Sequence, residues 1–480
     1  FQGAVNSPLS DNFAIRVAGW YFKQKAGEFY NITRGEEVDR SEDKGARLSA
    51  RWDVNDAWSV TWVAEYQETE GPAGRTYAPN GVNSFGNLTP KETPRTIRRD
   101  ASLRAETKQV YLSQNIQYET GSAGTFNLLA AYRNYDLLSQ EDQDYTAIPI
   151  SSAPFAIRQD LNRDESIENA YVELVWTSPQ DQPFTWVAGA SYFNEKFEFA
   201  RIIETSLDFS RITFLGFPPI GPQTAWGALP GQGTTIKTEA YSLFADFEYA
   251  FSDKFSLTAS LRYSSDKKKL DYSQYVYGNP ATLPLFLILF ANVIVPFDLK
   301  TEPTFDHFSP SVGFHYQMSD NVNIYGLISD GFRAGGFNTT STAPALIPFN
   351  SEKATNYELG VKTQWYGGDL GVNLAVFYME QKDLLVRRND PISPPAFNFT
   401  YLQNAGDAET WGAELEIYAR LAPWLTGAAT VGWLDAQYVR GDAFGTSLVG
   451  HNIPYTRDWT LNVRLDADIP VDADWAVVGT

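Results

Sequence analysis

Apolar and polar residues alternate along much of this chain, and that alternation is its clearest structural signal. Every odd-numbered residue between Tyr241 and Phe251 is apolar, whereas the even-numbered positions include Asp246 and Glu248. The same pattern recurs over residues 257–263. A period of two is the side-chain period of a β-strand, so these stretches predict strands with one apolar and one polar face. Stretches with the period of a helix are nearly absent, and the sequence therefore predicts an all-β protein.

The polar face of the predicted strands repeatedly carries charge. Glu358 and Lys362 alternate with Tyr357, Leu359 and Val361 in one such strand. Burying an isolated charge is costly, so a face that carries charge in strand after strand must contact water. The opposite, aromatic-rich face then needs surroundings other than water.

Nine short segments rich in Asp, Asn, Gly and Pro separate pairs of predicted strands, and we interpret them as tight hairpin turns. They are residues 7–12, 54–57, 120–124, 178–183, 252–254, 318–321, 367–369, 421–423 and 469–473. Longer polar connections, such as 68–104 and 271–301, link one hairpin to the next. Nine hairpins predict about eighteen strands in which short and long connections alternate.

The lengths of the predicted strands fit a membrane. A strand such as 241–251 advances about 33 Å, and a tilt of about 45° reduces its height to about 23 Å, close to the apolar band of an outer-membrane barrel. Aromatic residues lie near the strand ends, where such barrels carry interfacial girdles. These residues are Trp58, Tyr66, Tyr132, Trp176, Trp186, Tyr192, Tyr263 and Tyr316. The sequence therefore predicts a transmembrane antiparallel β-barrel of the bacterial outer membrane.

A soluble β-sandwich or propeller is the alternative, because for any single strand the apolar face could be core. Such a protein would have to bury the aromatic-rich faces of about eighteen strands against each other. The alternation of short turns and long connections has no counterpart in a sandwich. The turn centres lie roughly 46 to 73 residues apart, which is too uneven for propeller blades.

Composition narrows the possible functions. The chain carries 38 Lys and Arg against 58 Asp and Glu, a net charge of −20, which argues against a nucleic-acid partner. A mean hydropathy of −0.31 is too polar for a bundle of membrane helices. The longest apolar stretch, 285–291, is far shorter than the roughly 20 residues of a spanning helix. The absence of cysteine excludes thiolate catalysis and cysteine-ligated metals in this chain.

Enzyme signatures are absent from the sequence. HExxH, GxSxG and P-loop motifs do not occur, so we predict no catalytic residue and no enzymatic activity. His307 and His315 share one strand face but lie about 27 Å apart along it, too far to hold one metal ion together. Acidic clusters at 36–43 and 141–144 carry oxygen ligands suited to Ca²⁺, although solvated loops explain them more simply. We expect no metal site and no cofactor.

Three arginines are candidates for contact with an anionic ligand or with the phosphates of lipopolysaccharide. Arg95, Arg98 and Arg99 lie in the longest predicted connection and stand out in an acidic chain. Arginine recognises carboxylate and phosphate groups through paired hydrogen bonds. The alternative is that these arginines balance the charge of neighbouring acidic loops.

Four further residues are candidates for ligand binding. Arg333 follows a predicted strand in a glycine-rich segment and has the parity of the inner face, although a role in the turn is the alternative. Trp226, Tyr275 and Tyr277 are aromatic residues of predicted loops that could stack on a ligand or pack across the barrel mouth. The apolar segment 283–297 predicts a loop that folds over the mouth.

Several short motifs resemble the barrel portion of TonB-dependent outer-membrane receptors of the iron-complex type. They are Ser-Pro-Leu-Ser-Asp at 7–11, Ser-Pro-Ser-Val-Gly at 309–313, Asn-Ile-Tyr at 323–325, Gly-Phe-Arg-Ala-Gly-Gly-Phe-Asn at 331–338, Asn-Tyr-Glu-Leu-Gly at 356–360, and Asn-Ala-Gly at 404–406 with Gly-Ala-Glu at 412–414. Their order is also the family's order, and the resemblance extends over essentially the whole chain. Residues 1–480 are therefore expected to form one outer-membrane β-barrel domain.

The resemblance implies a 22-stranded barrel closed by an N-terminal plug, with about 18 strands in this chain and neither the plug nor the last strands expected in it. It also implies active import of a scarce solute, above all a ferric siderophore, driven by the TonB complex through the missing N-terminal region. The expected partners are outer-membrane lipid and lipopolysaccharide, the TonB complex and a small-molecule ligand. The alternative is a passive large-pore channel or a surface-binding β-barrel.

Overall fold

The fold is one large antiparallel sheet. The computed structural model of the 480-residue chain describes residues 1–73, 95–99, 102–142, 157–208, 224–278, 295–389, 400–443, 446–470 and 476–479. Helical structure in this described part consists of two short 3₁₀ turns, η2 (Pro344–Leu346) and η3 (Tyr366–Gly368). No helix among these residues is long and apolar enough to span a membrane.

The long strands follow one another in chain order across the sheet, each paired antiparallel with its neighbours. They are β1 (Gln2–Ser10), β2 (Phe13–Lys23), β5 (Glu42–Asn55), β6 (Trp58–Gly71), β8 (Arg104–Glu119), β9 (Thr125–Asp142), β10 (Ile157–Thr177), β11 (Phe184–Asp208), β12 (Thr224–Ser252), β13 (Phe255–Gly278), β15 (Thr304–Ser319), β16 (Val322–Arg333), β19 (Glu352–Trp365), β20 (Leu370–Asn389), β21 (Thr400–Ala422), β22 (Leu425–Ala443), β24 (Trp459–Pro470) and β25 (Ala476–Gly479). Two short segments, β14 (Phe297–Thr301) and β23 (Thr446–Ser447), complete the 20-stranded sheet by pairing with β13 and β22. The predicted all-β architecture of about eighteen strands is confirmed.

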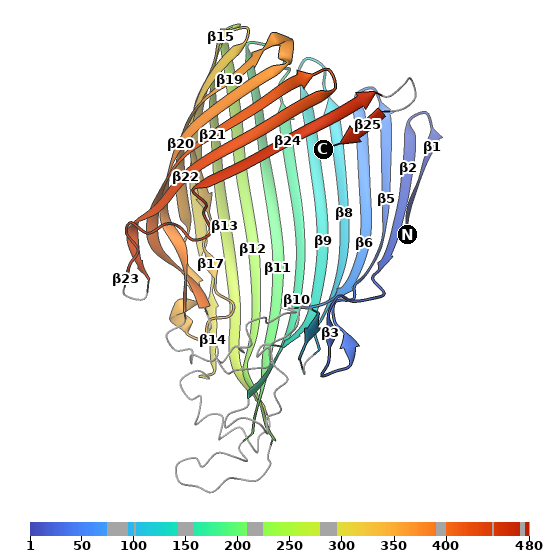
Figure 1. The fold of residues 1–480 in the computed structure, drawn as a ribbon, viewed down its shortest axis with the longest axis vertical. Coiled ribbons are helices and arrows are strands. Elements are labelled where there is room, and N and C mark those ends of the chain that lie inside the picture. Colours follow the sequence, from blue (N-terminus) through green and yellow to red (C-terminus); the bar gives the residue numbers. More distant parts are fainter. Residues whose placement is uncertain are drawn as a thin grey trace.

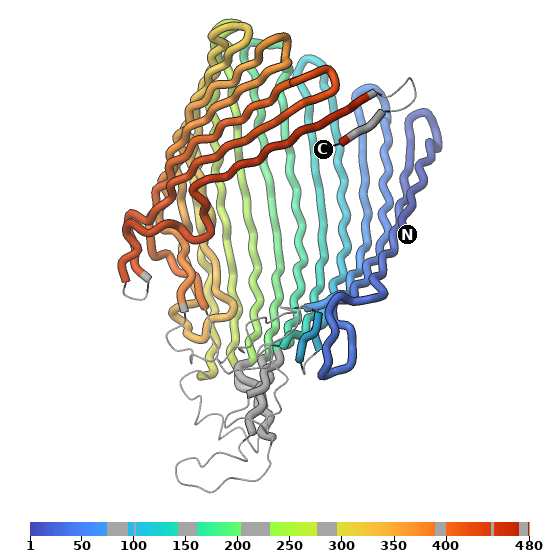
Figure 2. Tube along the Cα trace, in the orientation of Figure 1, coloured from blue at the N-terminus to red at the C-terminus, as the bar shows by residue number. Residues whose placement is uncertain are grey.

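The sheet curls into a tall curved wall. Figure 1 shows the orange-to-red strands crossing in front of the blue-to-green ones, with short turns along the upper rim and the strand ends that lead into the long connections along the lower rim. The continuous trace of Figure 2 makes this division of the two rims easier to follow. All nine predicted hairpins are present as antiparallel pairs, from β1–β2 to β24–β25. The local turn chemistry therefore sets the topology.

The apolar face of the wall points outward. On β12, Tyr241 is 54% exposed and Leu243 is 63% exposed, whereas Ser242 between them is buried. The register aligns these residues with Tyr192 and Ala190 of β11 and with Ser265 and Tyr263 of β13. A water-soluble protein would bury such side chains, so this exposed band requires an apolar environment. The polar face lines the concave interior, which we call the lumen.

Aromatic side chains collect at the two edges of the outward band. Near the short turns Trp58 stacks on Tyr118 at a centroid distance of 4.1 Å, and Trp176 contacts Trp186 at 4.6 Å. Nearer the long connections, Tyr192 packs against Tyr241 at 4.9 Å. Amphipathic rings are favoured at the interface between hydrocarbon and water. These positions match the predicted girdles.

We predict opposite outcomes for lysine at two adjacent positions of β12. Ala245 pairs with Ala188 and Leu261 on the outward face, whereas Asp246 points into the lumen. Ala245→Lys places a cation in hydrocarbon and should cost about 2–4 kcal/mol of folding free energy. Asp246→Lys should leave folding nearly unchanged, because water solvates the new charge. The measurement is the folded fraction of the full-length protein in lipid vesicles.

Each substitution is the other's control, since both introduce lysine into the same strand. A larger loss for Asp246→Lys would reverse the assignment of the two faces throughout the sheet, because a one-residue slip exchanges them.

Candidate functional site

A segment between β16 and β19 folds against the lumen wall near the long connections. It contains β17 (Gly336–Phe337), η2 and β18 (Pro348–Phe349), and β17 pairs antiparallel with β18. We call residues 334–351 the inner segment. In Figure 1, β17 lies above β14, in the lower half of the wall. The inner segment begins inside the Gly-Phe-Arg-Ala-Gly-Gly-Phe-Asn motif.

Apolar packing seats the inner segment on β13. Leu270, Tyr272 and Ile347 are almost fully buried against each other. By the alternation of β13, Leu270 and Tyr272 lie on the lumen face, opposite in parity to the exposed Tyr263. The partly buried residues packed around this cluster are Ile236, Phe297, Leu299 and Phe337. This cluster is one of the few places in the described chain where apolar side chains are buried inside the wall.

Hydrogen bonds from the wall fix the backbone of the inner segment. The Tyr272 hydroxyl donates to the Ser341 carbonyl at 2.8 Å, and Gln232 Nε2 donates to the Tyr272 oxygen at 3.0 Å. Lys268 Nζ donates to the Gly335 carbonyl at 2.8 Å. Buried carbonyls need such donors, because water does not reach them.

Two asparagines join the inner segment to β21. Asn338 Nδ2 donates to the carbonyls of Leu346 at 2.7 Å and Leu402 at 2.9 Å, while its Oδ1 accepts from the Leu402 amide at 2.8 Å. Asn404 mirrors this arrangement at the other end: its Oδ1 accepts from the Asn350 amide at 2.7 Å and its Nδ2 donates to the Asp383 carbonyl at 2.7 Å. Both residues belong to motifs singled out in the sequence. The motifs alone do not reveal that these side chains hold the two ends of the inner segment against β21.

Close backbone packing explains a glycine of the same motif. A Cβ atom on Gly335 would lie 2.5 Å from the Phe349 carbonyl oxygen and 2.5 Å from the Phe305 ring. Such contacts are far shorter than van der Waals distance, so the chain can pass between these groups only as glycine.

Two arginines face each other on the lumen wall next to this region. Arg163 of β10 and Arg201 of β11 are paired in register, and both have lumen parity. Arg163 lies 3.5 Å from Glu141, and its side chain is 35% exposed. Glu141 also interacts electrostatically with Arg201, so the two guanidinium groups lie near one carboxylate. Residue spacing does not reveal this arrangement, because only the register brings the two arginines together.

The predicted site residues do not converge on one place. Arg333 is 65% exposed and forms an ion pair with Glu352 of the neighbouring strand at 3.1 Å. Tyr275 is exposed on β13. Trp226 of β12 and Tyr277 of β13 lie where only the backbone is described. The prediction that these residues and Tyr275 belong to loops is wrong, because the paired strands extend past them. Their proposed contact with a ligand therefore stays a prediction.

The predicted arginine cluster lies in a small separate sheet at the lower rim. There β3 (Tyr30–Asn31) pairs with β4 (Glu36–Glu37) and, in parallel, with β7 (Thr96–Ile97). Arg95 and Arg98 are exposed, whereas Arg99 is fully buried and its carbonyl accepts from Asn31 Nδ2 at 3.0 Å. We therefore keep Arg95 and Arg98 as candidates for ligand contact and place Arg99 in the packing of this sheet.

Most of the predicted mouth-covering segment 283–297 lies outside the described residues, and its end, Phe297, stacks on Tyr272 at 5.4 Å.

Glu37 of the acidic cluster 36–43 lies in β4 of the rim sheet. The Gly27 amide and Arg40 donate hydrogen bonds to its carboxylate and so hold the pKa of Glu37 below its ordinary value. Across the described ranges, no three His, Asp, Glu or Cys side chains gather closely enough to hold a metal ion.

Comparison with known proteins places the wall in a family. The model described as "TonB dependent receptor-like, beta-barrel" matches residues 195–479. The chain belongs to the TonB-dependent receptor β-barrel family. Its barrel is therefore an outer-membrane barrel, in agreement with the outward apolar band.

Relatives of this TonB-dependent receptor barrel are named as receptors for pesticin or for metal complexes. The chain is 29% identical over 186 residues to the pesticin receptor of Yersinia enterocolitica, covering 38% of this chain and 24% of that protein. It is 30% identical over 148 residues to the metal-pseudopaline receptor CntO of Pseudomonas aeruginosa, covering 30% and 19%. The chain thus matches about a quarter or less of these relatives' length.

Solved structures share the fold of the barrel. The ferric yersiniabactin uptake receptor FyuA from Yersinia pestis has a TM-score of 0.68 at 17% identity, covering 98% of this chain and 63% of FyuA. The ferripyoverdine receptor of Pseudomonas aeruginosa has a TM-score of 0.64 at 15% identity, covering 98% and 58%. At these identities the similarity concerns the fold alone.

We predict that Asn338→Ala releases the inner segment without unfolding the barrel. The change leaves the amide and carbonyl of Leu402 without their partner, which should cost roughly 1–3 kcal/mol locally. Hydrogen–deuterium exchange of the full-length protein should show faster exchange over residues 336–349 and unchanged exchange in β10–β12.

Asn323→Ala is the matched control, because its side chain donates a single hydrogen bond, to Gln317, near the opposite rim. Unchanged protection of residues 336–349 in Asn338→Ala would contradict the conclusion that Asn338 holds the inner segment against β21.

Proposed function

We propose that the full-length protein is a TonB-dependent active transporter that imports a scarce solute, most specifically a ferric siderophore. The observation that carries this proposal is the family membership of residues 195–479, together with metal-complex receptors among the relatives. A solute of this kind is too large and too dilute for simple diffusion through a narrow pore. Import then needs a wide lumen and an energy source outside the barrel.

The structure supports a division of labour within the barrel. The strand ends that lead into the long connections lie on one rim, which we assign to solute capture, and the polar lumen wall offers a path away from this rim. The inner segment occupies the start of this path and is held at both ends by Asn338 and Asn404. In this proposal a plug outside this chain gates the lumen, and the TonB complex moves the plug.

The charges near the rim favour an anionic solute. Arg95 and Arg98 are exposed on the rim sheet, and Arg163 is partly exposed on the lumen wall beside Glu141. The chain as a whole carries a net charge of −20, so these arginines are local exceptions. Guanidinium groups bind carboxylate-rich or catecholate chelates through paired hydrogen bonds. We assign Arg333, Tyr275, Trp226 and Tyr277 to the same capture surface as a prediction.

A passive large-pore channel or a surface-binding barrel is the second candidate. The width of an eighteen-strand wall favours it, because barrels of this size can hold an open aqueous channel. It differs from the transporter in needing no energy.

We predict that uptake by the full-length protein depends on the proton-motive force. Cells that express it as their sole siderophore receptor should accumulate an iron-55-labelled siderophore, and a protonophore should abolish that accumulation. Surface binding at 4 °C should persist under the same treatment, because capture needs no energy. A panel of hydroxamate, catecholate and phenolate siderophores identifies the ligand class.

Cells without the TonB complex serve as the matched control and should bind but not accumulate the complex. Accumulation that continues in these cells, or after protonophore treatment, would make the passive channel the better account.

A further inference from the structure

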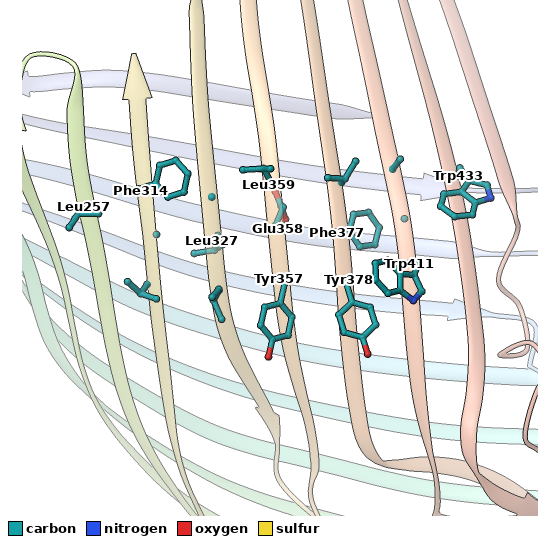
Figure 3. Close-up of a pocket in the computed structure, with 17 residues that line it drawn as sticks. Leu257, Phe314, Leu327, Tyr357, Glu358, Leu359, Phe377, Tyr378, Trp411 and Trp433 are labelled. Carbon is teal, nitrogen blue, oxygen red and sulfur yellow. The ribbon is translucent and has the colours of Figure 1, made fainter. Parts of the chain in front are cut away.

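The inner segment crosses the lumen side of several strands. Its hydrogen-bond partners lie on β12 and β13 in one direction and on β21 in the other, whereas it is rooted in β16 and β19. In sheet order these strands are β12, β13, β15, β16, β19, β20 and β21. The outward side of the wall in this sector carries an apolar hollow of about 640 Å³ around Tyr357 and Trp411, which belongs to the hydrocarbon-facing surface (Figure 3). The inner segment therefore shapes the lumen and not the outer face.

Anchors on both sides of its roots hold the inner segment. Toward β12 and β13, the Ser341 carbonyl accepts hydrogen bonds from the Tyr272 hydroxyl at 2.8 Å and from Gln232 Nε2 at 3.4 Å. Toward β21, Asn404 Nδ2 donates to the carbonyls of Asn350 at 3.0 Å and Ser351 at 3.3 Å. A lid that swings about its two roots would have to break both sets of hydrogen bonds at once.

Undocking would also expose apolar surface. Leu270 is 1% exposed, and Tyr272 and Ile347 are 0% exposed. Transfer of such side chains to water is unfavourable, and so is the loss of donors to buried carbonyls. Segments that move during function are drawn from the weakly packed parts of a structure, and the inner segment is not one of them.

The backbone of the inner segment is itself constrained. β17 pairs with β18, and the Asn338 amide donates to the Ile347 carbonyl at 2.7 Å across the base of the turn between them. Pro344 begins η2 and Pro348 follows it, and each proline ring fixes its own φ angle. The segment is therefore a rigid body rather than a flexible loop.

One side of this rigid body faces away from the wall. Ile347 packs on β13, whereas Pro344 and Ala345 of η2 are exposed. Their side chains carry no hydrogen-bonding or charged atom, so they act on a passing solute only through their volume. The exposed side of η2 thus narrows the lumen without providing a polar binding site.

We propose that the inner segment is a fixed constriction of the transport path and that η2 limits the size of the solute that passes. The segment stays docked on β12, β13 and β21 while the solute moves, instead of opening as a lid. Ala345 sets the free width beside the turn, because it has the smallest exposed side chain of η2. This inference rests on the proposed transport function, and the three tests below separate the failure of one from the failure of the other.

A distance measurement tests docking without any transport. Nitroxides are attached to Ala345→Cys and Ser113→Cys, the second a position of lumen parity on β8, in the full-length receptor in lipid vesicles. Double electron–electron resonance should give one distance population. That population should stay unchanged when ferric hydroxamate, catecholate or phenolate siderophores are added. A second population, with or without siderophore, would overturn the fixed constriction.

A cross-link tests docking during uptake. In Leu270→Cys/Ile347→Cys, two side chains that pack against each other are joined by oxidation or by a short bis-methanethiosulfonate, and mass spectrometry measures the joined fraction. Uptake of the iron-55-labelled siderophores should be equal in the joined and reduced forms. Loss of uptake that reduction restores would overturn the proposal while leaving the transport function intact. Cysteines that cannot be joined would contradict the docking itself.

Added volume on η2 tests the size limit. Ala345→Trp should lower the rate of uptake, most strongly for the bulkiest siderophore complexes, and should leave surface binding at 4 °C unchanged. Thr446→Trp is the matched control, because it adds the same ring at an exposed position of β23 in another connection, and it should behave like the parent. Heat-dependent gel mobility verifies that each variant folds.

Equal uptake by Ala345→Trp and the parent would overturn the size limit. If the parent takes up none of the siderophores, the transport function fails, and the distance measurement alone decides whether the inner segment is fixed.

Discussion

Backbone hydrogen bonding in a medium without water is the constraint on which this structure depends. Each amide and carbonyl of a strand in hydrocarbon needs a partner on a neighbouring strand. The meander from β1 to β25 supplies these partners by pairing each strand with its neighbours in sequence. Because every connection joins adjacent strands, side chains are free to serve other purposes: outward residues meet lipid, and inward residues meet water.

The period of two makes the two faces independent. On β12, Leu243 and Ser242 are neighbours in sequence but lie in different media. The inner face can therefore carry two facing arginines, Arg163 and Arg201, without disturbing the outer face. It can also carry the asparagines that hold the inner segment, Asn338 and Asn404. The outer face can likewise carry an apolar hollow without affecting the lumen.

Sequence reasoning predicted the fold well because the relevant signals are local. Alternation over 241–251 and turn residues such as those at 252–254 act within a few positions, and both were confirmed by the paired strands β12 and β13. The family motifs gave the correct family, since they mark the barrel as a whole.

The candidate site was harder to predict, because its contacts are long-range. Asn338 reaches a residue 64 positions away, and Arg201 meets Arg163 only through the register of two strands. Arg99 resembled a surface cation in sequence, yet the rim sheet buries it. Residue type and spacing do not encode such encounters; they follow from the curvature of the wall and the path of the inner segment.

The central claim is that alternate residues of each strand face hydrocarbon, and a spin-label scan tests it most directly. This chain contains no cysteine, so single cysteines can be introduced at positions 241–248 and labelled with a nitroxide. In lipid vesicles, the account predicts high accessibility to dissolved oxygen at odd positions and low accessibility at even positions, with a period of two. Uniform accessibility along the strand, or alternation with the opposite phase, would contradict the account.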